Sequence, residues 1–154
     1  MELCFFRHGD AEAAAGADEA RELTARGRRE SRAVGEALRG AGVSPGAILT
    51  SPLTRARQTG EILEEVFGVG AEAEERLGSG CGLGAIQDLS AERAQEQVIF
   101  VGHEPDMSRI VGELIGSARV RMKKSGCARV CCESVEPGAG MLIWLVSPEL
   151  LVSE

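Results

Sequence analysis

Short apolar runs alternate with longer amphipathic stretches along the first two thirds of the chain. Residues 2–6, 47–50 and 98–102 are almost continuously apolar, which is typical of strands that are buried on both faces of a sheet. Between the first two runs and after the second, residues 24–40 and 52–67 repeat apolar positions at helical spacing. This alternation predicts an α/β fold in which helices cover both faces of a sheet.

Capping residues predict where these two helices begin and end. Thr24 is a suitable N-cap for the first helix, and Gly40 or Gly42 would end it. Ser51 followed by Pro52 predicts the start of the second helix, because proline is favoured at the first helical position. The predicted buried stripes are Val34, Ala37, Leu38 and Ala41 in the first helix, and Ala56, Thr59, Leu63 and Val66 in the second.

The chain between residues 70 and 97 is less regular. We expect a strand near 72–77, a glycine-rich loop and a short helix that ends at Gln95. A helix should follow the strand at 98–102, starting near Pro105 and ending at Gly116. Its predicted buried face comprises Ile110, Val111, Leu114 and Ile115.

Two further strands are expected near the end of the chain, at 127–135 and 141–146. The second, MLIWLV, has the composition of a buried strand. The turn sequence EPGAG joins the pair, so these strands should be antiparallel. The predicted sheet is therefore mixed but mostly parallel, within a single domain spanning 1–154.

Composition and charge exclude several classes of protein. The longest apolar run is far shorter than the roughly 20 residues that span a bilayer. The amino terminus lacks the pattern of a secretory signal, so we expect a cytoplasmic protein with no membrane association. A net charge of −7 argues against binding to nucleic acid, which requires a basic surface.

The five cysteines do not form a recognisable disulfide framework or zinc site. In a strand, Cys127 and Cys131 would lie about 13 Å apart, too far to share a metal ion. Cys132 would face the other side of that strand, with Ala128 and Val130. We interpret the cysteines as small residues of a reduced protein, and expect no metal and no cofactor.

Both histidines of the chain, His8 and His103, directly follow an apolar strand. Ligands of α/β sheets bind beyond the carboxyl ends of the strands, which is where these side chains should lie. A single histidine at such a place is more often a loop residue whose ring binds a backbone carbonyl. Two histidines at the same edge of the sheet favour a functional site.

Two arginines accompany the histidines. Arg7 precedes His8, and Arg55 falls in the first turn of the second predicted helix, where a cation is disfavoured by the helix dipole. Arg55 could simply turn into solvent. Alternatively, two guanidinium groups and a helix amino terminus would bind a doubly charged oxyanion such as phosphate. A neutral imidazole could then attack the phosphoryl group, with no need for a metal.

Three segments, FFRHGD, LTSPLTRARQT and VIFVGHEPDMS, resemble the histidine phosphatase superfamily, also called the phosphoglycerate mutase-like family. The resemblance extends from residue 3 to about 115. The compact length and the segments RELTARG and MKKSGCARV are most similar to the SixA-type phosphohistidine phosphatases. This resemblance implies a three-layer α/β/α sandwich with a mixed, mostly parallel sheet.

The resemblance also implies an activity and four residue roles. His8 would be the nucleophile that becomes phosphorylated, Arg7 and Arg55 would bind the phosphoryl oxygens, and His103 would complete the pocket. The implied reaction is the hydrolysis of phosphohistidine in a partner protein through a phosphohistidine enzyme intermediate, without metal or cofactor. Arg21 is a further site residue by resemblance, or an exposed residue of a charged loop.

Many relatives use an additional carboxylate to protonate the leaving group. Asp10, Glu75 and Glu104 are candidates by position, and each could equally be an ordinary surface carboxylate. The segment RLGSGCGLGAI stands where the SixA-type pattern usually contains proline, so the wall of the groove is uncertain there. An absent acid would be tolerable for phosphohistidine, because imidazole leaves more readily than an alkoxide.

Two alternatives to a phosphohistidine phosphatase remain open. The chain could be a small-molecule phosphomonoesterase of the same superfamily, acting on a phosphate ester, or a non-catalytic phosphate-binding module. A basic cluster, Arg119, Arg121, Lys123 and Lys124, could dock an acidic protein partner or form a solvated strand edge. The oligomeric state stays open as well.

Overall fold

The computed structural model describes residues 1–13, 16–93 and 97–152. Its strands are β1 (Glu2–Arg7), β2 (Ala47–Thr50), β3 (Ala71–Ala73), β4 (Gln97–Gly102), β5 (Cys127–Cys132) and β6 (Gly140–Val146). Its α-helices are α1 (Ala25–Gly40), α2 (Thr54–Phe67), α3 (Leu83–Arg93) and α4 (Asp106–Leu114). Three short 3-10 helices are also described, η1 (Asp18–Ala20), η2 (Glu75–Leu77) and η3 (Pro148–Leu150).

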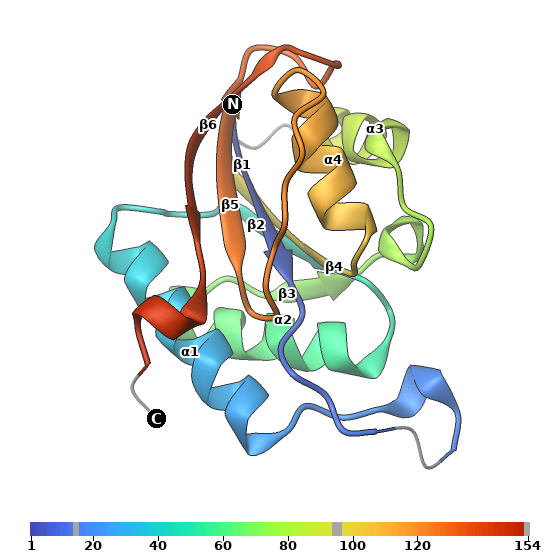
Figure 1. Ribbon diagram of the computed structural model, residues 1–154, viewed down its shortest axis with the longest axis vertical. Coiled ribbons are helices and arrows are strands. Elements are labelled where there is room, and N and C mark those ends of the chain that lie inside the picture. Colours follow the sequence, from blue (N-terminus) through green and yellow to red (C-terminus); the bar gives the residue numbers. More distant parts are fainter. Residues whose placement is uncertain (14–15, 94–96, 153–154) are drawn as a thin grey trace.

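The strands form one sheet in the order β3-β2-β4-β1-β5-β6. The pairs β1–β4, β2–β4 and β2–β3 are parallel, whereas β1–β5 and β5–β6 are antiparallel. The prediction of a mixed, mostly parallel sheet is therefore confirmed. Because β1 and β4 are neighbours, the two segments that end in histidine lie side by side (Figure 1).

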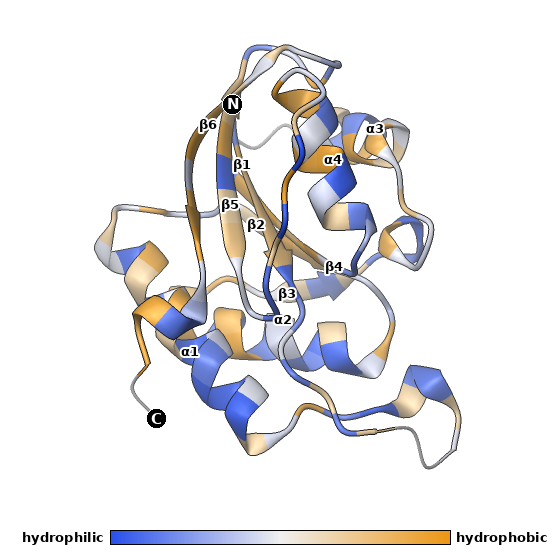
Figure 2. Cartoon of the chain, viewed as in Figure 1, coloured by the Kyte–Doolittle hydropathy of each residue, from blue (hydrophilic) through white to orange (hydrophobic). Residues whose placement is uncertain are grey.

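Helices cover both faces of this sheet, and successive side chains of β1 pack against helices on opposite faces. Leu3 and Phe5 belong to a core that includes residues of α3 and α4. Cys4 and Phe6 point the other way, into a core shared with α1 and α2. The chain is a three-layer α/β/α sandwich, with apolar strands between helices whose outer faces are polar (Figures 1 and 2).

The capping analysis is correct for α1 and wrong for the start of α2. Thr24 is the N-cap of α1, and its hydroxyl accepts a hydrogen bond from the backbone N–H of Gly27. Helix α2 begins at Thr54 rather than at Pro52, because the Ser51 hydroxyl accepts the backbone N–H of Leu53 and closes a turn before the helix. The predicted stripe of α2 is buried, but Ala41 of the α1 stripe is exposed, since it follows the last residue of the helix.

Other predicted boundaries need smaller corrections. The strand expected at 72–77 is β3, which ends at Ala73 and is followed by η2. The strand expected at 127–135 ends at Cys132. Helix α4 ends at Leu114, before the expected stop at Gly116. The predicted end of the preceding helix at Gln95 lies outside the described residues.

The prediction that the MLIWLV strand is buried is wrong. In β6 the side chains of Met141, Leu142 and Ile143 are 69%, 38% and 45% exposed. The reason is the sheet order, which makes β6 an edge strand with a neighbour on one side only. None of the helices in the described part of the chain is long and apolar enough to cross a bilayer.

Candidate active site

The register of the sheet sets the two histidines beside each other. Arg7 of β1 is paired with Gly102 of β4, so the next residue of each strand, His8 and His103, occupies the same edge. The backbone N–H of His8 donates to Gly102 O at 3.0 Å. The two ring centroids are 5.1 Å apart, with 56° between the ring planes. Both side chains are almost entirely buried.

The neighbouring strand β2 and helix α2 complete the cluster. Thr50 pairs with Val101, and the following Ser51 places its hydroxyl oxygen 2.7 Å from Nε2 of His103. Arg55, the second residue of α2, is buried and donates from Nε to Nε2 of His8 at 3.3 Å. The structure thus brings together residues 47 positions apart in the chain.

The loop after β1 is held tightly against α1 and α2. The backbone N–H of Gly9 donates to Thr59 Oγ1, and the same hydroxyl donates to the backbone oxygen of Arg55. A Cβ atom at Gly9 would lie 2.7 Å from Ser31 Oγ and 2.8 Å from the backbone oxygen of Gly27. Glycine is therefore required for this close approach, which fixes His8 relative to Arg55.

A backbone contact determines the tautomer of His8. Its Nδ1 lies 2.7 Å from the carbonyl oxygen of Gly9, and a carbonyl oxygen can only accept a hydrogen bond. Nδ1 therefore carries the proton, and Nε2 holds a lone pair directed at the Nε–H of Arg55. Nε2 is the nitrogen that could act as a nucleophile.

Both imidazoles are neutral near pH 7. Burial lowers the pKa of His8 to about 3, and the positive charges of Arg55 and Arg7 add to this effect against the opposing hydrogen bond to Gly9. Burial, followed by the charge of Arg55, lowers the pKa of His103 to about 4. A neutral ring keeps the lone pair that attack on phosphorus requires.

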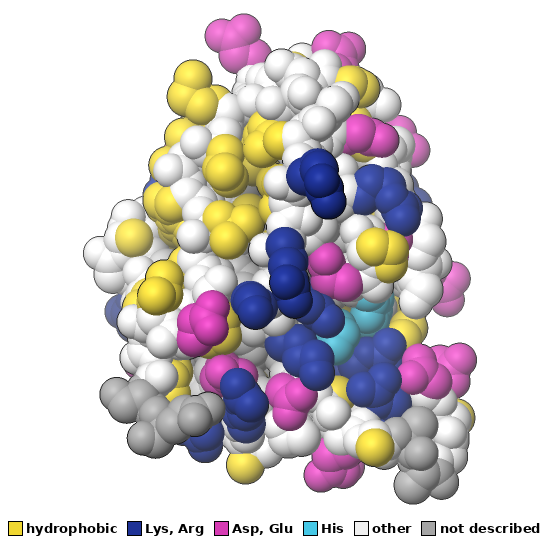
Figure 3. Space-filling view, in the orientation of Figure 1, with side chains coloured by type: hydrophobic (Ala, Val, Ile, Leu, Met, Phe, Trp, Pro, Cys, Tyr) yellow, Lys and Arg dark blue, Asp and Glu magenta, His cyan; other side chains and the backbone are white. Residues whose placement is uncertain are grey.

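Arg7 extends the positive potential on the other side of His8. Its Nη1 donates to the backbone oxygen of Met122 at 2.9 Å, which fixes the guanidinium group at the end of β1. Lys and Arg side chains surround the histidine atoms that reach the surface (Figure 3). Two guanidinium groups and two imidazoles at one edge of the sheet form a site suited to a phosphoryl group.

The chain matches the model of the histidine phosphatase superfamily (branch 1) over residues 3–125. It belongs to this superfamily. The phosphohistidine phosphatase SixA of Escherichia coli is 31% identical to it over 155 aligned positions, which cover 96% of this chain and 94% of that protein. An uncharacterised protein of Picosynechococcus is 37% identical over 113 positions, covering 70% of this chain and 68% of that protein.

Solved structures of the superfamily have the same fold. The protein histidine phosphatase SixA complexed with tungstate superposes with a TM-score of 0.88 at 31% identity, covering 99% of this chain and 100% of that one. A phosphoserine phosphatase of Entamoeba histolytica in complex with phosphoserine gives a TM-score of 0.75 at 15% identity, covering 98% and 99%. The fold and the predicted family are confirmed, and the chain is a phosphatase of this superfamily.

One acidic residue near the site was missed in the sequence. Arg55 donates to Asp18 twice, from Nη1 to its backbone oxygen at 3.0 Å and from Nη2 to its carboxylate at 3.3 Å. Arg21 pairs with the same carboxylate at 3.1 Å and donates to the backbone oxygen of Glu12. A hydrogen bond from Arg21 and the charge of Arg55 lower the pKa of Asp18. Asp18 is the first residue of the short helix η1, a single turn in which no periodicity could have revealed this contact.

Among the three candidate acids, two are engaged elsewhere. The Asp10 carboxylate accepts hydrogen bonds from Lys124 and Thr24, which lower its pKa against the opposing effect of burial. The Glu104 carboxylate accepts from the backbone N–H and the hydroxyl of Ser108. Glu75 is the exposed first residue of η2. These contacts favour the ionised form of Asp10, which cannot donate a proton.

Ser51 is a second residue whose importance the sequence understated. Its hydroxyl was expected only to cap a helix, but it also contacts His103. Within the described residues, His103 Nδ1 and Arg7 Nε are buried without a hydrogen-bond partner. In the same part of the chain, no group of three or more His, Cys, Asp or Glu side chains is arranged to hold a metal ion.

Proposed function

We propose that this protein hydrolyses phosphohistidine in a protein substrate and that His8 is the nucleophile. The observation that carries the proposal is the fixed His8 ring, whose Nε2 lone pair faces Arg55 at 3.3 Å while Nδ1 is bound to Gly9. A ring held in this tautomer needs no general base before it attacks. The proposal requires no metal ion.

The reaction would proceed in two displacements. Nε2 of His8 bonds to phosphorus as the N–P bond of the substrate breaks, and the substrate imidazole leaves with a proton taken from solvent or from its surroundings. Water then attacks the phosphorus of phosphorylated His8, which releases inorganic phosphate and restores the neutral ring. Arg7 and Arg55 would bind the phosphoryl oxygens in both steps, and His103 would donate to them from the opposite side.

Two observations support phosphohistidine over a phosphate ester. An ester releases an alkoxide, which requires a positioned acid, whereas Asp10 and Glu104 are both occupied by other contacts. SixA, which is named as a phosphohistidine phosphatase, is similar to nearly the whole chain. The likeness to a phosphoserine phosphatase at 15% identity concerns the fold alone.

The test compares wild type with His8→Ala on a phosphohistidine-bearing phosphotransfer domain and on a panel of phosphate esters. We expect wild type to prefer phosphohistidine and to form an acid-labile phosphoenzyme. His8→Ala should form none, and its kcat/KM should fall by about 10³-fold or more. The variant's circular dichroism spectrum should be unchanged, which controls for folding.

Three results would contradict the proposal. Faster turnover of an ester than of phosphohistidine would favour a small-molecule phosphomonoesterase. No turnover of either substrate, with phosphate still bound, would favour a non-catalytic phosphate-binding module. Full activity of His8→Ala would show that another residue is the nucleophile.

A further inference from the structure

The segment between α4 and β5 presents a row of positive charges beside the site. Residues 119–124, RVRMKK, alternate between basic and apolar side chains over most of their length. Val120 and Met122 pack against the core that α4 also contacts, and Met122 is 1% exposed. The other four side chains of the segment are exposed, and we name them the basic strip: Arg119, Arg121, Lys123 and Lys124.

Backbone contacts attach this segment firmly to the catalytic edge of the sheet. The N–H of Met122 donates to Ser108 Oγ, and its carbonyl accepts from Arg7 Nη1. Three residues later, the N–H of Ser125 donates to the backbone oxygens of Arg7 and His8. The basic strip is therefore held in a fixed position relative to His8, with no intervening flexible connection.

The basic strip is not a protected sheet edge. It precedes β5, which begins at Cys127 and already has β1 on one side and β6 on the other. Lysine and arginine that merely prevent edge pairing would lie on an outer strand, as β6 is here. Another reason is needed for four cations in six residues of a chain whose net charge is −7.

Most of the charge on the basic strip is unneutralised. Lys124 pairs with Asp10 at 3.0 Å, but no residue in the described ranges forms an ion pair with Arg119, Arg121 or Lys123. Some other arginines have acidic partners, as in the pairs Arg76–Glu92 and Arg93–Glu72. Burial is the main cause that lowers the pKa of Arg7, and the charge of Arg121 adds to it against the opposing charge of Glu104, so the field of the strip reaches the site. A site for anions thus continues beyond the phosphoryl pocket.

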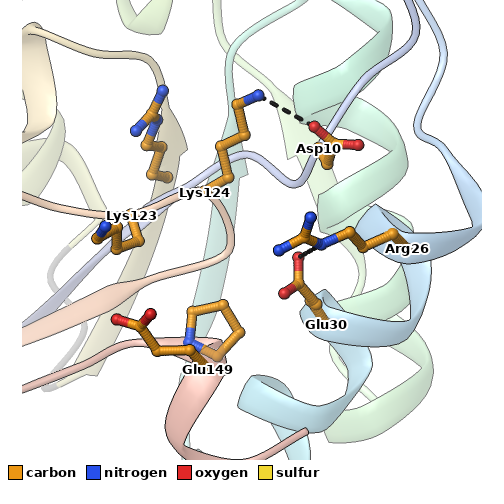
Figure 4. Close-up of a pocket in the computed structure, with 8 residues that line it drawn as sticks. Asp10, Arg26, Glu30, Lys123, Lys124 and Glu149 are labelled. Carbon is orange, nitrogen blue, oxygen red and sulfur yellow. Dashed lines mark hydrogen bonds and ion pairs between the residues drawn. The ribbon is translucent and has the colours of Figure 1, made fainter. Parts of the chain in front are cut away.

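A cavity of about 280 Å³ connects Arg7 with the end of the basic strip (Figure 4). It is lined by Arg7, Asp10, Arg26, Glu30, Lys123, Lys124, Pro148 and Glu149. Two of its acids are already paired, Asp10 with Lys124 and Glu30 with Arg26. Glu149 also lines the cavity, whose lining holds four cationic side chains against three acidic ones and is therefore net positive.

We propose that the basic strip docks an acidic surface of the phosphorylated protein substrate, beside its phosphohistidine. This inference rests on the proposed function. Met122, which lies within the strip, is bonded to Arg7 at the phosphoryl site, and Lys and Arg side chains extend from the histidine atoms across this face of the molecule (Figure 3). Only a substrate larger than a free amino acid could contact both the site and the strip. Nucleic acid and anionic membranes fit less well, because the rest of this acidic chain would repel such extended polyanions.

The experiment uses two synthetic peptides that each carry one phosphohistidine, flanked by aspartates in one and by serines in the other. Free phosphohistidine is the third substrate. We expect wild type to have a kcat/KM about tenfold higher for the aspartate peptide than for the serine peptide at low salt. This preference should fall when about 0.5 M NaCl screens the charges.

The decisive variant is Arg121→Ser/Lys123→Ser, which removes two exposed cations of the basic strip. Its kcat/KM for the aspartate peptide, divided by that for free phosphohistidine, should fall about tenfold. The matched control is Arg28→Ser/Arg39→Ser, which removes the same charge from two exposed positions of α1. The control should keep the wild-type ratio. Thermal unfolding of both variants checks that they are folded.

The outcomes separate this inference from the function on which it rests. If both double variants hydrolyse phosphohistidine and show the same preference for the aspartate peptide, the docking surface is overturned and the proposed function stands. No hydrolysis of any phosphohistidine substrate would overturn the proposed function and the docking role with it. A third outcome would overturn the docking role and favour a membrane-binding surface. In that case wild type would show no preference between the peptides but would bind phosphatidylserine vesicles, and this binding would be lost in Arg121→Ser/Lys123→Ser.

Discussion

The carboxylate of Asp18 is paired with the guanidinium group of Arg55, to which a phosphoryl oxygen of the substrate is proposed to bind. Its carboxylate lies 3.3 Å from Arg55 Nη2, and its side chain is 57% exposed whereas that of Arg55 is 8% exposed. Because the Asp18 carboxylate is exposed, water competes with Arg55 for it and weakens this ion pair. A phosphoryl dianion carries more charge than a carboxylate, so it can displace Asp18 from Arg55 at small cost.

Replacing Asp18 should therefore strengthen phosphate binding. In Asp18→Asn the competing charge is lost, and we expect the inhibition constant of inorganic phosphate to fall about three- to tenfold. Asp88→Asn, an exposed position on α3, is the matched control and should leave the constant unchanged. Weaker phosphate binding in Asp18→Asn would show instead that Asp18 is needed to orient Arg55.

At the scale of elements, the site depends on how closely α2 lies on β2. Helix α2 carries Arg55 and also Thr59, which binds the loop after β1. Gly60 follows them, and a Cβ atom there would lie 2.3 Å from Thr50 Cγ2. A glycine in the middle of a helix normally reduces its stability, so this one is explained by the close packing.

Gly60→Ala should destabilise the protein although alanine is the better helix former. We expect the free energy of unfolding to fall by about 1–3 kcal/mol, and kcat to fall with it, because α2 must move away from β2. Gly40→Ala is the matched control, since no atom lies within 4 Å of a Cβ there. It should be neutral or raise stability by up to about 1 kcal/mol. Equal effects on urea unfolding in the two variants would contradict this account.

The whole molecule responds to pH through its two buried histidines. Their pKa values are about 3 and about 4 in the folded protein, against an ordinary value of 6.5. Below pH 6.5 the unfolded chain therefore binds protons that the folded chain does not. The free energy of unfolding falls as the pH is lowered from 6.5 towards 4.

This pH dependence can be assigned by substitution. Each histidine should lower the free energy of unfolding by up to about 1.4 kcal/mol per pH unit in that range. The difference in slope between wild type and His8→Gln/His103→Gln isolates their contribution, because the carboxylates titrate in both. Parallel curves from urea unfolding at pH 4 to 7 would show that the histidines are not buried in the neutral form.

The sequence alone determined the alternation of strands and helices, the cap of α1 at Thr24 and the placement of both histidines after apolar strands. These features follow from short-range rules, because periodicity, capping and strand ends depend on residues close together in the chain. The motifs around His8 and His103 also indicated the family, which the match to the superfamily model over residues 3–125 confirms.

The remaining features depend on contacts between distant parts of the chain. The Asp18–Arg55 contact joins residues 37 positions apart, and the exposure of Ile143 follows from the edge position of β6. Such contacts depend on the order of strands and the packing of loops, which bring together residues that no local pattern connects.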